Sequence, residues 1–282
     1  MHLFKKNSEL QQYLKAKQEQ GLSIGFVPTM GALHQGHLSL IHNAQEKADI
    51  IVCSIFVNPT QFDDKSDLAK YPRPVSKDME KLEAIGCHVL FLPSAEEIYP
   101  PDLPEVHFDL AGLDKTMEGA HRTGHFEGVV QVVHRLLDIV QPDSLYMGQK
   151  DFQQFTIIKR MLKLMDSPIQ LVRVPIMREE DGLAMSSRNV RLSETGRKKA
   201  GKINKILFQA QEDAKKMDLA TVRANALTRL KEGEFDVDYF TIVDGDSLQE
   251  INRFEQSKTS VVCTTIRIDG IRLLDNIILK EA

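Results

Sequence analysis

The chain has 282 residues, of which 42% are hydrophobic and 27% are charged, and its net charge is -4. This is the composition of an ordinary globular protein of roughly two domains, and it excludes a collagen-like, coiled-coil or wholly disordered chain. The small negative charge predicts no general attraction to nucleic acid or to an anionic membrane.

Apolar, β-branched runs alternate with helical patterns over the first 176 residues. The predicted strands are residues 22–28, 50–57, 88–92, 144–147 and 169–176, and the predicted helices are residues 36–47, 75–85, 127–140 and 151–165. Strands that alternate with helices indicate a mostly parallel sheet with helices on both faces. We therefore predict an α/β domain over residues 1–176 with a Rossmann-like, doubly wound parallel sheet.

The pattern changes after residue 176. Two polar-faced helices are predicted over residues 194–216 and 219–231, and strands over residues 237–243, 260–268 and 271–279. The dipeptide Asp269-Gly270 joins the last two strands and is a strong hairpin signal. A second, smaller α+β domain is therefore predicted over residues 177–282.

The cysteines and the N-terminal sequence indicate in which cellular compartment the protein is expected. Cys53, Cys87 and Cys263 lie in or beside apolar stretches, with no spacing typical of a metal site, which favours buried reduced thiols. The N-terminus lacks the apolar core of a signal peptide. The longest mostly apolar run is far shorter than the ~20 residues of a membrane span. A cytoplasmic protein is expected.

Ligands of open parallel sheets bind beyond the carboxyl ends of the strands. The polar segments that follow the predicted strands are residues 29–37, 58–62, 148–151 and 178–188. We expect these four segments to converge on one edge of the sheet.

Residues 30–37, MGALHQGH, are the most informative of these segments. Gly31 and Gly36 allow a close approach of backbone to ligand, and a helix that starts near Gly36 offers N–H groups to an anion. No P-loop and no GxGxxG pattern occurs. His34 and His37 are either polar residues at a helix start or donors beside a triphosphate. A zinc site is the weakest interpretation, because no third ligand is in register.

The segment PTMGALHQGH, residues 28–37, resembles the nucleotide-binding signature of the pantothenate synthetase (pantoate–β-alanine ligase) family. This family lies in the superfamily of nucleotidyltransferases and class I synthetases. The resemblance continues in order through FVNPTQF, HRTGHFEGV, MGQKDFQQ and DGLAMSSRN. Five ordered segments spread over nearly the whole chain make it highly specific.

The resemblance implies an enzyme that uses ATP to join (R)-pantoate and β-alanine through a pantoyl adenylate, releasing AMP and pyrophosphate. It implies catalytic roles for His34, His37 and Lys150. It implies that Gln61 and Gln154 bind pantoate and that Gln61 also binds β-alanine. The implied ATP-binding residues are Met30, Gly31, Ala32, Leu33, His34, Gln35, Gly36, His37, Gly148, Gln149, Lys150, Asp151, Met177, Met185, Ser186, Ser187 and Arg188.

Mg²⁺ is expected to arrive on the phosphates of ATP rather than on metal ligands of the protein. The resemblance also implies a homodimer that binds the small molecules pantoate, β-alanine and ATP. Because Ser186, Ser187 and Arg188 lie at the start of the second domain, we expect this domain to close over the nucleotide as a lid. Two other functions stay open: a nucleotidyltransferase that leaves the nucleotide on its product, and a nucleotide sensor without catalysis. An aminoacyl-tRNA synthetase is disfavoured, because the chain is acidic overall and shows no evident anticodon-binding part.

Several of these residues also have simpler interpretations. Gln154 suits the solvated face of an amphipathic helix, and Asp151 suits a helix N-cap. His121, Arg122 and His125 lie in a glycine-containing loop. This loop is a mobile surface loop in the simpler interpretation, and a lid or a contact for β-alanine in the functional one. These three residues are not included in the predicted site.

Overall fold

The structure is a computed structural model that describes residues 1–62 and 65–281. The chain divides into two compact units. The first is formed by Met1–Gly148 and Ile157–Val174, and the second by Gln149–Thr156 and Pro175–Ala282. The change at Val174 lies close to the boundary expected at residue 176. The assignment of Gln149–Thr156 to the second unit has no counterpart in the sequence pattern.

The first unit is built on a six-stranded, all-parallel sheet with the strand order β1-β4-β3-β2-β5-β6. Its strands are β1 (His2–Phe4), β2 (Ile24–Thr29), β3 (Ile50–Ile55), β4 (Val89–Phe91), β5 (Ser144–Gly148) and β6 (Gln170–Val174). From β2 the chain winds outward through β3 and β4, and from β5 it winds the other way. The predicted doubly wound α/β fold is therefore confirmed, and its switch point lies between β2 and β5.

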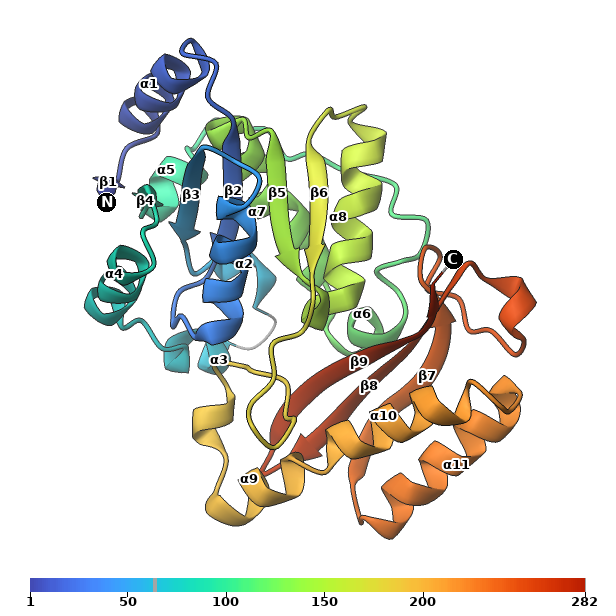
Figure 1. The fold of residues 1–282 in the computed structure, drawn as a ribbon. Coiled ribbons are helices and arrows are strands. Elements are labelled where there is room, and N and C mark those ends of the chain that lie inside the picture. Colours follow the sequence, from blue (N-terminus) through green and yellow to red (C-terminus); the bar gives the residue numbers. More distant parts are fainter. Residues whose placement is uncertain (63–64, 282) are drawn as a thin grey trace. The chain divides into compact units, whose positions relative to one another are not determined.

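Helices cover both faces of this sheet. The helical elements of the first unit are α1 (Asn7–Gln18), α2 (Gln35–Gln45), α3 (Lys65–Lys70), α4 (Val75–Ala84), α5 (Ala95–Ile98), α6 (Met117–His121), α7 (His125–Val140) and most of α8 (Phe152–Leu164), with the short 3-10 turn η1 (Pro59–Gln61). The 3-10 turn η2 (Gln149–Asp151) belongs to the second unit. Apolar residues of α2 and α4, such as Ile41 and Leu82, share one core with Cys53 of β3. In Figure 1, α2 lies in front of the sheet and α7 behind it.

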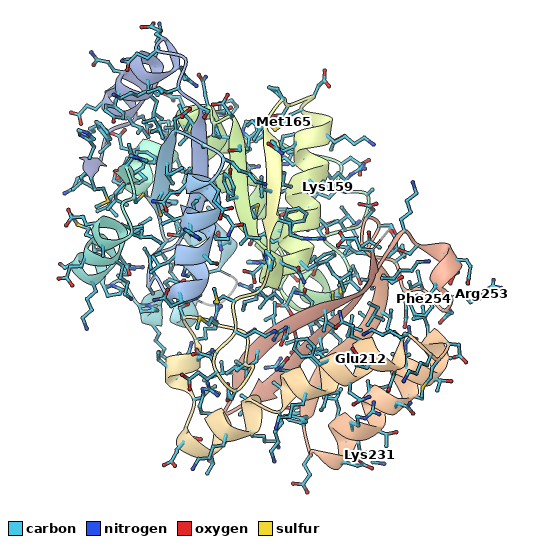
Figure 2. All side chains as sticks on the ribbon, viewed as in Figure 1. Lys159, Met165, Glu212, Lys231, Arg253 and Phe254 are labelled. Atoms are coloured by element: carbon cyan, nitrogen blue, oxygen red, sulfur yellow. The ribbon has the colours of Figure 1, made fainter. Side chains whose placement is uncertain are left out.

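The second unit has an antiparallel sheet of the order β7-β8-β9, which confirms the smaller α+β part. Its elements are β7 (Asp236–Asp244), β8 (Thr259–Ile268), β9 (Ile271–Glu281), α9 (Glu194–Ala200), α10 (Ile203–Asp213), α11 (Leu219–Glu232), η3 (Asn189–Arg191) and η4 (Phe254–Gln256). Asp269 and Gly270 both have positive φ, as the expected hairpin turn requires. Glu212 on α10 and Lys231 on α11 extend on exposed faces of their helices (Figure 2).

The helix predicted over residues 194–216 is two helices, α9 and α10, so this prediction was wrong. The chain breaks at Gly201, the C-cap of α9. A β-carbon on Gly201 would come within 2.2 Å of the Asp181 carboxylate. Glycine therefore allows the Asp181 loop to approach the helix end, and this tertiary contact leaves no mark on the hydrophobic pattern.

Candidate active site

The turn between β2 and α2 is fixed by a buried carboxylate. Gly31 and Ala32 have φ of 80° and 51°, and a β-carbon on Gly31 would lie 3.0 Å from Ile55 and 3.1 Å from Asp78. Only glycine fits the first position without displacing a neighbour. The Asp78 side chain, buried on α4, accepts hydrogen bonds from the N–H groups of Ala32 and Leu33, both at 2.8 Å. No motif or spacing in the sequence predicted this role for Asp78.

His34 and His37 are held at the N-terminus of α2 by their own backbone. His34 Nδ1 accepts a hydrogen bond from the N–H of Gly36 at 3.1 Å, and His37 Nδ1 accepts from the N–H of His34 at 3.2 Å. The ring centroids lie 4.0 Å apart. Because each Nδ1 is an acceptor, the hydrogen of each neutral ring resides on Nε2. Both imidazoles are thus fixed in the tautomer that donates from Nε2.

The Gln61 side chain lies at the end of η1, after β3, in an amide network. Its Oε1 accepts from Asn58 Nδ2 at 3.2 Å, and its Nε2 donates to the sulfur of Met30 at 3.3 Å. Asn58 also donates to the carbonyl of Gly128 at 3.0 Å and accepts from the Tyr99 hydroxyl at 3.0 Å. The network orients the buried Gln61 amide, so that its NH₂ group is the donor on the Met30 side.

The backbone of Gln61 is held by α7. His125, which is buried, places Nδ1 2.8 Å from the Gln61 carbonyl oxygen and must donate, since a carbonyl can only accept. Its Nε2 then accepts from Arg122 Nη1 at 3.1 Å. A β-carbon on Gly128 would lie 2.6 Å from the carbonyl oxygen of Thr60, so glycine is needed where α7 packs against η1. His125 and Arg122 were left out of the predicted site, although they lie in one of the five quoted segments.

In the second unit, Lys150 and Asp151 lie in η2, directly before α8. Lys150 Nζ and Asp151 Oδ1 are 3.3 Å apart. Gln149 donates from Nε2 to Asn276 Oδ1 at 3.1 Å. Gln154 is half-buried in the first turn of α8. Lys150, predicted to contact ATP, and Gln154, predicted to contact pantoate, thus lie only four residues apart in the chain.

The loop over residues 177–188 is closed on itself by backbone hydrogen bonds. The N–H of Met185 donates to the carbonyl of Met177 at 3.0 Å, and Ser186 Oγ accepts from the N–H of Arg188 at 3.3 Å. Asp181 is paired with Arg197 of α9. The hydrogen bond from Arg197 lowers the pKa of the Asp181 carboxyl, although partial burial opposes this shift. Asp181 is therefore an anion that anchors the loop carrying the predicted phosphate ligands.

The predicted site residues fall into two groups, one in each unit. The first group comprises Met30, Gly31, Ala32, Leu33, His34, Gln35, Gly36, His37, Gln61 and Gly148. The second comprises Gln149, Lys150, Asp151, Gln154, Met177, Met185, Ser186, Ser187 and Arg188. Within the first unit, β2 and β5 are adjacent strands. The segment of residues 30–37 directly follows β2, and Gly148 is the last residue of β5. Both therefore lie at the switch point of the sheet. That point is where doubly wound sheets bind ligands.

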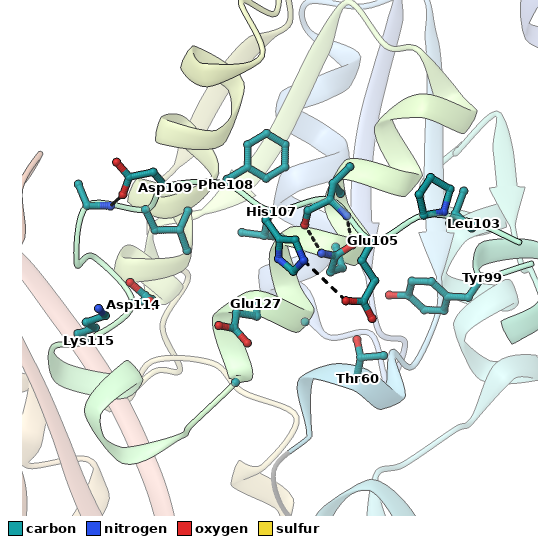
Figure 3. A pocket seen from close by; sticks show the side chains of 18 of the residues that line it. Thr60, Tyr99, Leu103, Glu105, His107, Phe108, Asp109, Asp114, Lys115 and Glu127 are labelled. Carbon is teal, nitrogen blue, oxygen red and sulfur yellow. Dashed lines mark hydrogen bonds and ion pairs between the residues drawn. The ribbon is translucent and has the colours of Figure 1, made fainter. Parts of the chain in front are cut away.

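A cavity of about 830 Å³ is lined by α7, by the segment of residues 99–115 and by Thr60 of η1. Figure 3 shows Thr60, Tyr99, Glu105, His107 and Glu127 around it. Of the residues described, those that line it include none of the predicted site residues. The cavity adjoins the Gln61 network through Thr60 and Tyr99, and it is distinct from the β2-α2 turn.

Two further properties concern metals and membranes. Among the residues that the structure describes, no group of three or more His, Cys, Asp or Glu side chains is placed to hold a metal ion. In the same part of the chain, no helix has both the length and the apolar character to span a membrane.

The fold places the chain among α/β proteins with a doubly wound parallel sheet, a class whose ligands bind at the carboxyl edge of the sheet. The family model of pantoate-beta-alanine ligase matches residues 2–278. The chain belongs to this family, as the sequence resemblance implied.

The similar proteins agree with this assignment. A pantothenate synthetase of Porphyromonas gingivalis is 46% identical over 98% of this chain and 99% of its own length. One of Phocaeicola vulgatus is also 46% identical, over 99% of this chain and all of its own. The crystal structure of pantothenate synthetase from Thermus thermophilus has a TM-score of 0.92 at 37% identity, covering 99% of this chain and 100% of that one.

A second similar solved structure is a complex with ligands. It is pantoate-beta-alanine ligase from Francisella tularensis, complexed with beta-gamma ATP and beta-alanine. Its TM-score is 0.81 at 33% identity, and the match covers 99% of this chain and 98% of that one.

Proposed function

We propose that the protein joins pantoate to β-alanine at the expense of ATP, with pantoyl adenylate as the intermediate. The observation that carries this proposal is the match, over nearly the whole chain, to a ligase solved with an ATP compound and β-alanine. The five segments that mark the family all lie in elements or loops described above, which supports the same activity for this chain.

In the first step, a carboxylate oxygen of pantoate attacks the α-phosphorus of ATP, and the bond from that phosphorus to the bridging oxygen breaks, releasing pyrophosphate. Negative charge gathers on the transferring group and on the leaving group, so fixed donors and cations accelerate the step. His34 and His37 suit this task, because their Nδ1 atoms are occupied by backbone N–H groups and Nε2 is the donor. We propose that Lys150 follows the developing pyrophosphate as a point charge.

In the second step, the β-alanine amine attacks the acyl carbon, the bond to the AMP oxygen breaks, and the nitrogen loses a proton. We propose that Gln61 and Gln154 hold pantoate and that Gln61 also contacts β-alanine. A neutral amide donates to a carboxylate without the strong ion pair that would hold the nucleophile back. The fixed orientation of the Gln61 amide supports this role.

The remaining phosphate contacts are assigned to Ser186, Ser187 and Arg188, which offer hydroxyl donors and a planar fork of N–H groups. We propose that these residues and Lys150, which all belong to the second unit, contact the phosphates when ATP binds. The second unit would then act as a lid. Mg²⁺ enters with ATP as part of the substrate complex. We further propose that the enzyme is a homodimer, as the family resemblance implies, and that it acts in the cytoplasm, as expected from the character of its N-terminal sequence.

The test is an analysis of products from ATP, pantoate and β-alanine in the presence of Mg²⁺. The proposal expects AMP, pyrophosphate and pantothenate in equal amounts. Formation of a nucleotidylated product instead of free AMP would support the nucleotidyltransferase alternative. Binding of ATP without turnover under any Mg²⁺ concentration would support the sensor.

A further inference from the structure

One buried amide of the second unit holds the backbone of the Lys150 segment. Asn276 lies on β9 and is 2% exposed. Its Nδ2 donates to the carbonyl oxygens of Gln149 and Lys150, both at 2.9 Å. Its Oδ1 accepts from Gln149 Nε2 at 3.1 Å. Both hydrogens and the oxygen of this amide are therefore used on two consecutive residues of η2.

The carboxamide of Asn276 suits this contact, and few other side chains could make it. Two adjacent carbonyl oxygens need two donors in one plane, which a carboxamide provides and a carboxylate does not. An aspartate at position 276 would set negative oxygens against both carbonyl oxygens. An alanine would leave both part-buried carbonyl oxygens without these donors, so the segment would lose both hydrogen bonds.

The neighbouring residue ties β9 to the second predicted phosphate-binding segment. Asp275 is buried and accepts from Arg178 Nη1 and Nη2 at 2.7 and 2.9 Å. Arg178 Nη1 also donates to the carbonyl of Gly182 at 3.0 Å, inside the loop that leads to Ser186. The N–H of Asn276 donates to Asp275 Oδ1 at 2.7 Å. Two consecutive residues of β9 thus hold both segments in place: Asn276 holds η2, and Asp275 holds the loop of residues 177–188 through Arg178.

We propose that Asn276 is a positioning residue for adenylate formation, because it sets the backbone from which Lys150 reaches the departing pyrophosphate. The inference rests on the proposed function. Lys150 has a long, flexible side chain, so the location of its ammonium group depends on where its backbone is held. A displacement of about 1 Å at a reacting group typically costs on the order of 100-fold in rate.

The test uses Asn276→Asp and Asn276→Ala in the full-length protein. Exchange of labelled pyrophosphate into ATP, which depends on pantoate, reports the first step alone. The expected result is a kcat for exchange lowered roughly 100-fold in N276D and at least roughly tenfold in N276A, with the KM for pantoate changed by less than about threefold. Asn276→Ala adds no charge, and it keeps the test decisive if N276D does not fold.

A second measurement separates positioning from general damage. Each variant is incubated with ATP, pantoate and pyrophosphatase until the adenylate has formed, and β-alanine is then added. AMP release in this second step should stay close to the wild-type rate, since Lys150 has no part in it. The matched control is Asp238→Asn on β7, which weakens the ion pairs of the half-buried Asp238 carboxylate with Arg267 and Arg272 in the same unit. It should lose stability and keep normal exchange.

The outcomes distinguish the two proposals. If wild-type protein shows no pantoate-dependent exchange, the proposed function is wrong, whatever the variants do. If the wild type exchanges and the folded Asn276 variants exchange equally fast, the positioning role is wrong and the proposed function stands. Equal losses in both steps, or an equal loss in D238N, would reduce Asn276 to a structural residue.

Discussion

His125 Nδ1 lies 2.8 Å from the carbonyl oxygen of Gln61, and the two residues are 64 positions apart in the chain. The contact joins the first turn of α7 to η1. It fixes the peptide that carries the amide proposed to bind pantoate. The position of the Gln61 side chain therefore depends on a residue that needs no contact with the substrate.

Replacing His125 by Phe removes this donor and leaves the buried carbonyl of Gln61 without its histidine partner. The loss of such a bond costs about 1–3 kcal/mol, so the KM for pantoate should rise roughly tenfold or more. Steady-state kinetics with varied pantoate measure this change. His125→Asn serves as the control, because its amide NH₂ can replace Nδ1 and should restore most of the affinity. Equal KM values in both variants would show that the hydrogen bond is not the cause.

The capping role of His37 can be separated from its proposed catalytic role. His37→Ala removes the acceptor for the N–H of His34, which should cost about 1 kcal/mol of the free energy of unfolding, and it also removes the Nε2 donor. In His37→Asn, Oδ1 can accept the same N–H, so stability should stay near that of the wild type. Adenylation should fall roughly 100-fold or more in both variants. Urea unfolding and pyrophosphate exchange give the two readouts. Near-normal exchange in His37→Asn would assign His37 to the cap alone.

The sequence predicted the elements with strong local signals. β3 is a run of apolar, mostly β-branched residues, and the turn at Asp269-Gly270 has the most specific hairpin dipeptide. The first strand, β1, has three residues, and α1 has only Leu10 and Leu14 buried among polar residues. Such short or weakly amphipathic elements are stabilised by tertiary contacts and leave little periodicity to read.

The same distinction applies to the candidate site. The segment of residues 30–37 could be located because its glycines and histidines are adjacent in sequence. Asp78 and Asn276 could not, because each acts through a backbone group far away in the chain. His125 lies in a recognisable segment, but its bond to the Gln61 carbonyl could not be predicted. A buried Asp or Asn with a backbone partner has no characteristic neighbours in sequence. Positioning residues of this kind became visible only in the folded chain.

The Asp78 carboxylate should be essential for the conformation of the β2-α2 turn. In Asp78→Asn, one carboxylate oxygen becomes an NH₂ group that faces a backbone N–H, so one of the two hydrogen bonds to Ala32 and Leu33 is lost. The expected loss of unfolding free energy is about 1–3 kcal/mol, with a higher KM for ATP. The control is Asp49→Asn, since Asp49 also accepts from a backbone N–H, of Ser23, but at the surface. Its effect should stay within about 0.5 kcal/mol. An equally small effect at Asp78 would contradict the assigned role.

Cys87 should make the fold sensitive to alkaline pH. Burial raises the pKa of the Cys87 thiol from its ordinary value of 9.0 to about 11. Between these two values the unfolded chain loses the thiol proton while the folded chain retains it. The free energy of unfolding should therefore fall as the pH rises from 9 to 11, by about 1.4 kcal/mol per pH unit for this group. Below pH 9 the thiol has no such effect.

Urea unfolding of wild type and Cys87→Ala at pH 8, 9.5 and 10.5 isolates this contribution, because other titrating groups are common to both proteins. The stability advantage of the wild type over C87A should shrink across this range. A difference that stays constant with pH would mean that the folded thiol ionises as readily as the unfolded one. In that case the Cys87 thiol, which is 3% exposed here, must be reached by solvent in the native state. Its reaction with a thiol reagent at pH 8 would then also be fast rather than limited by unfolding.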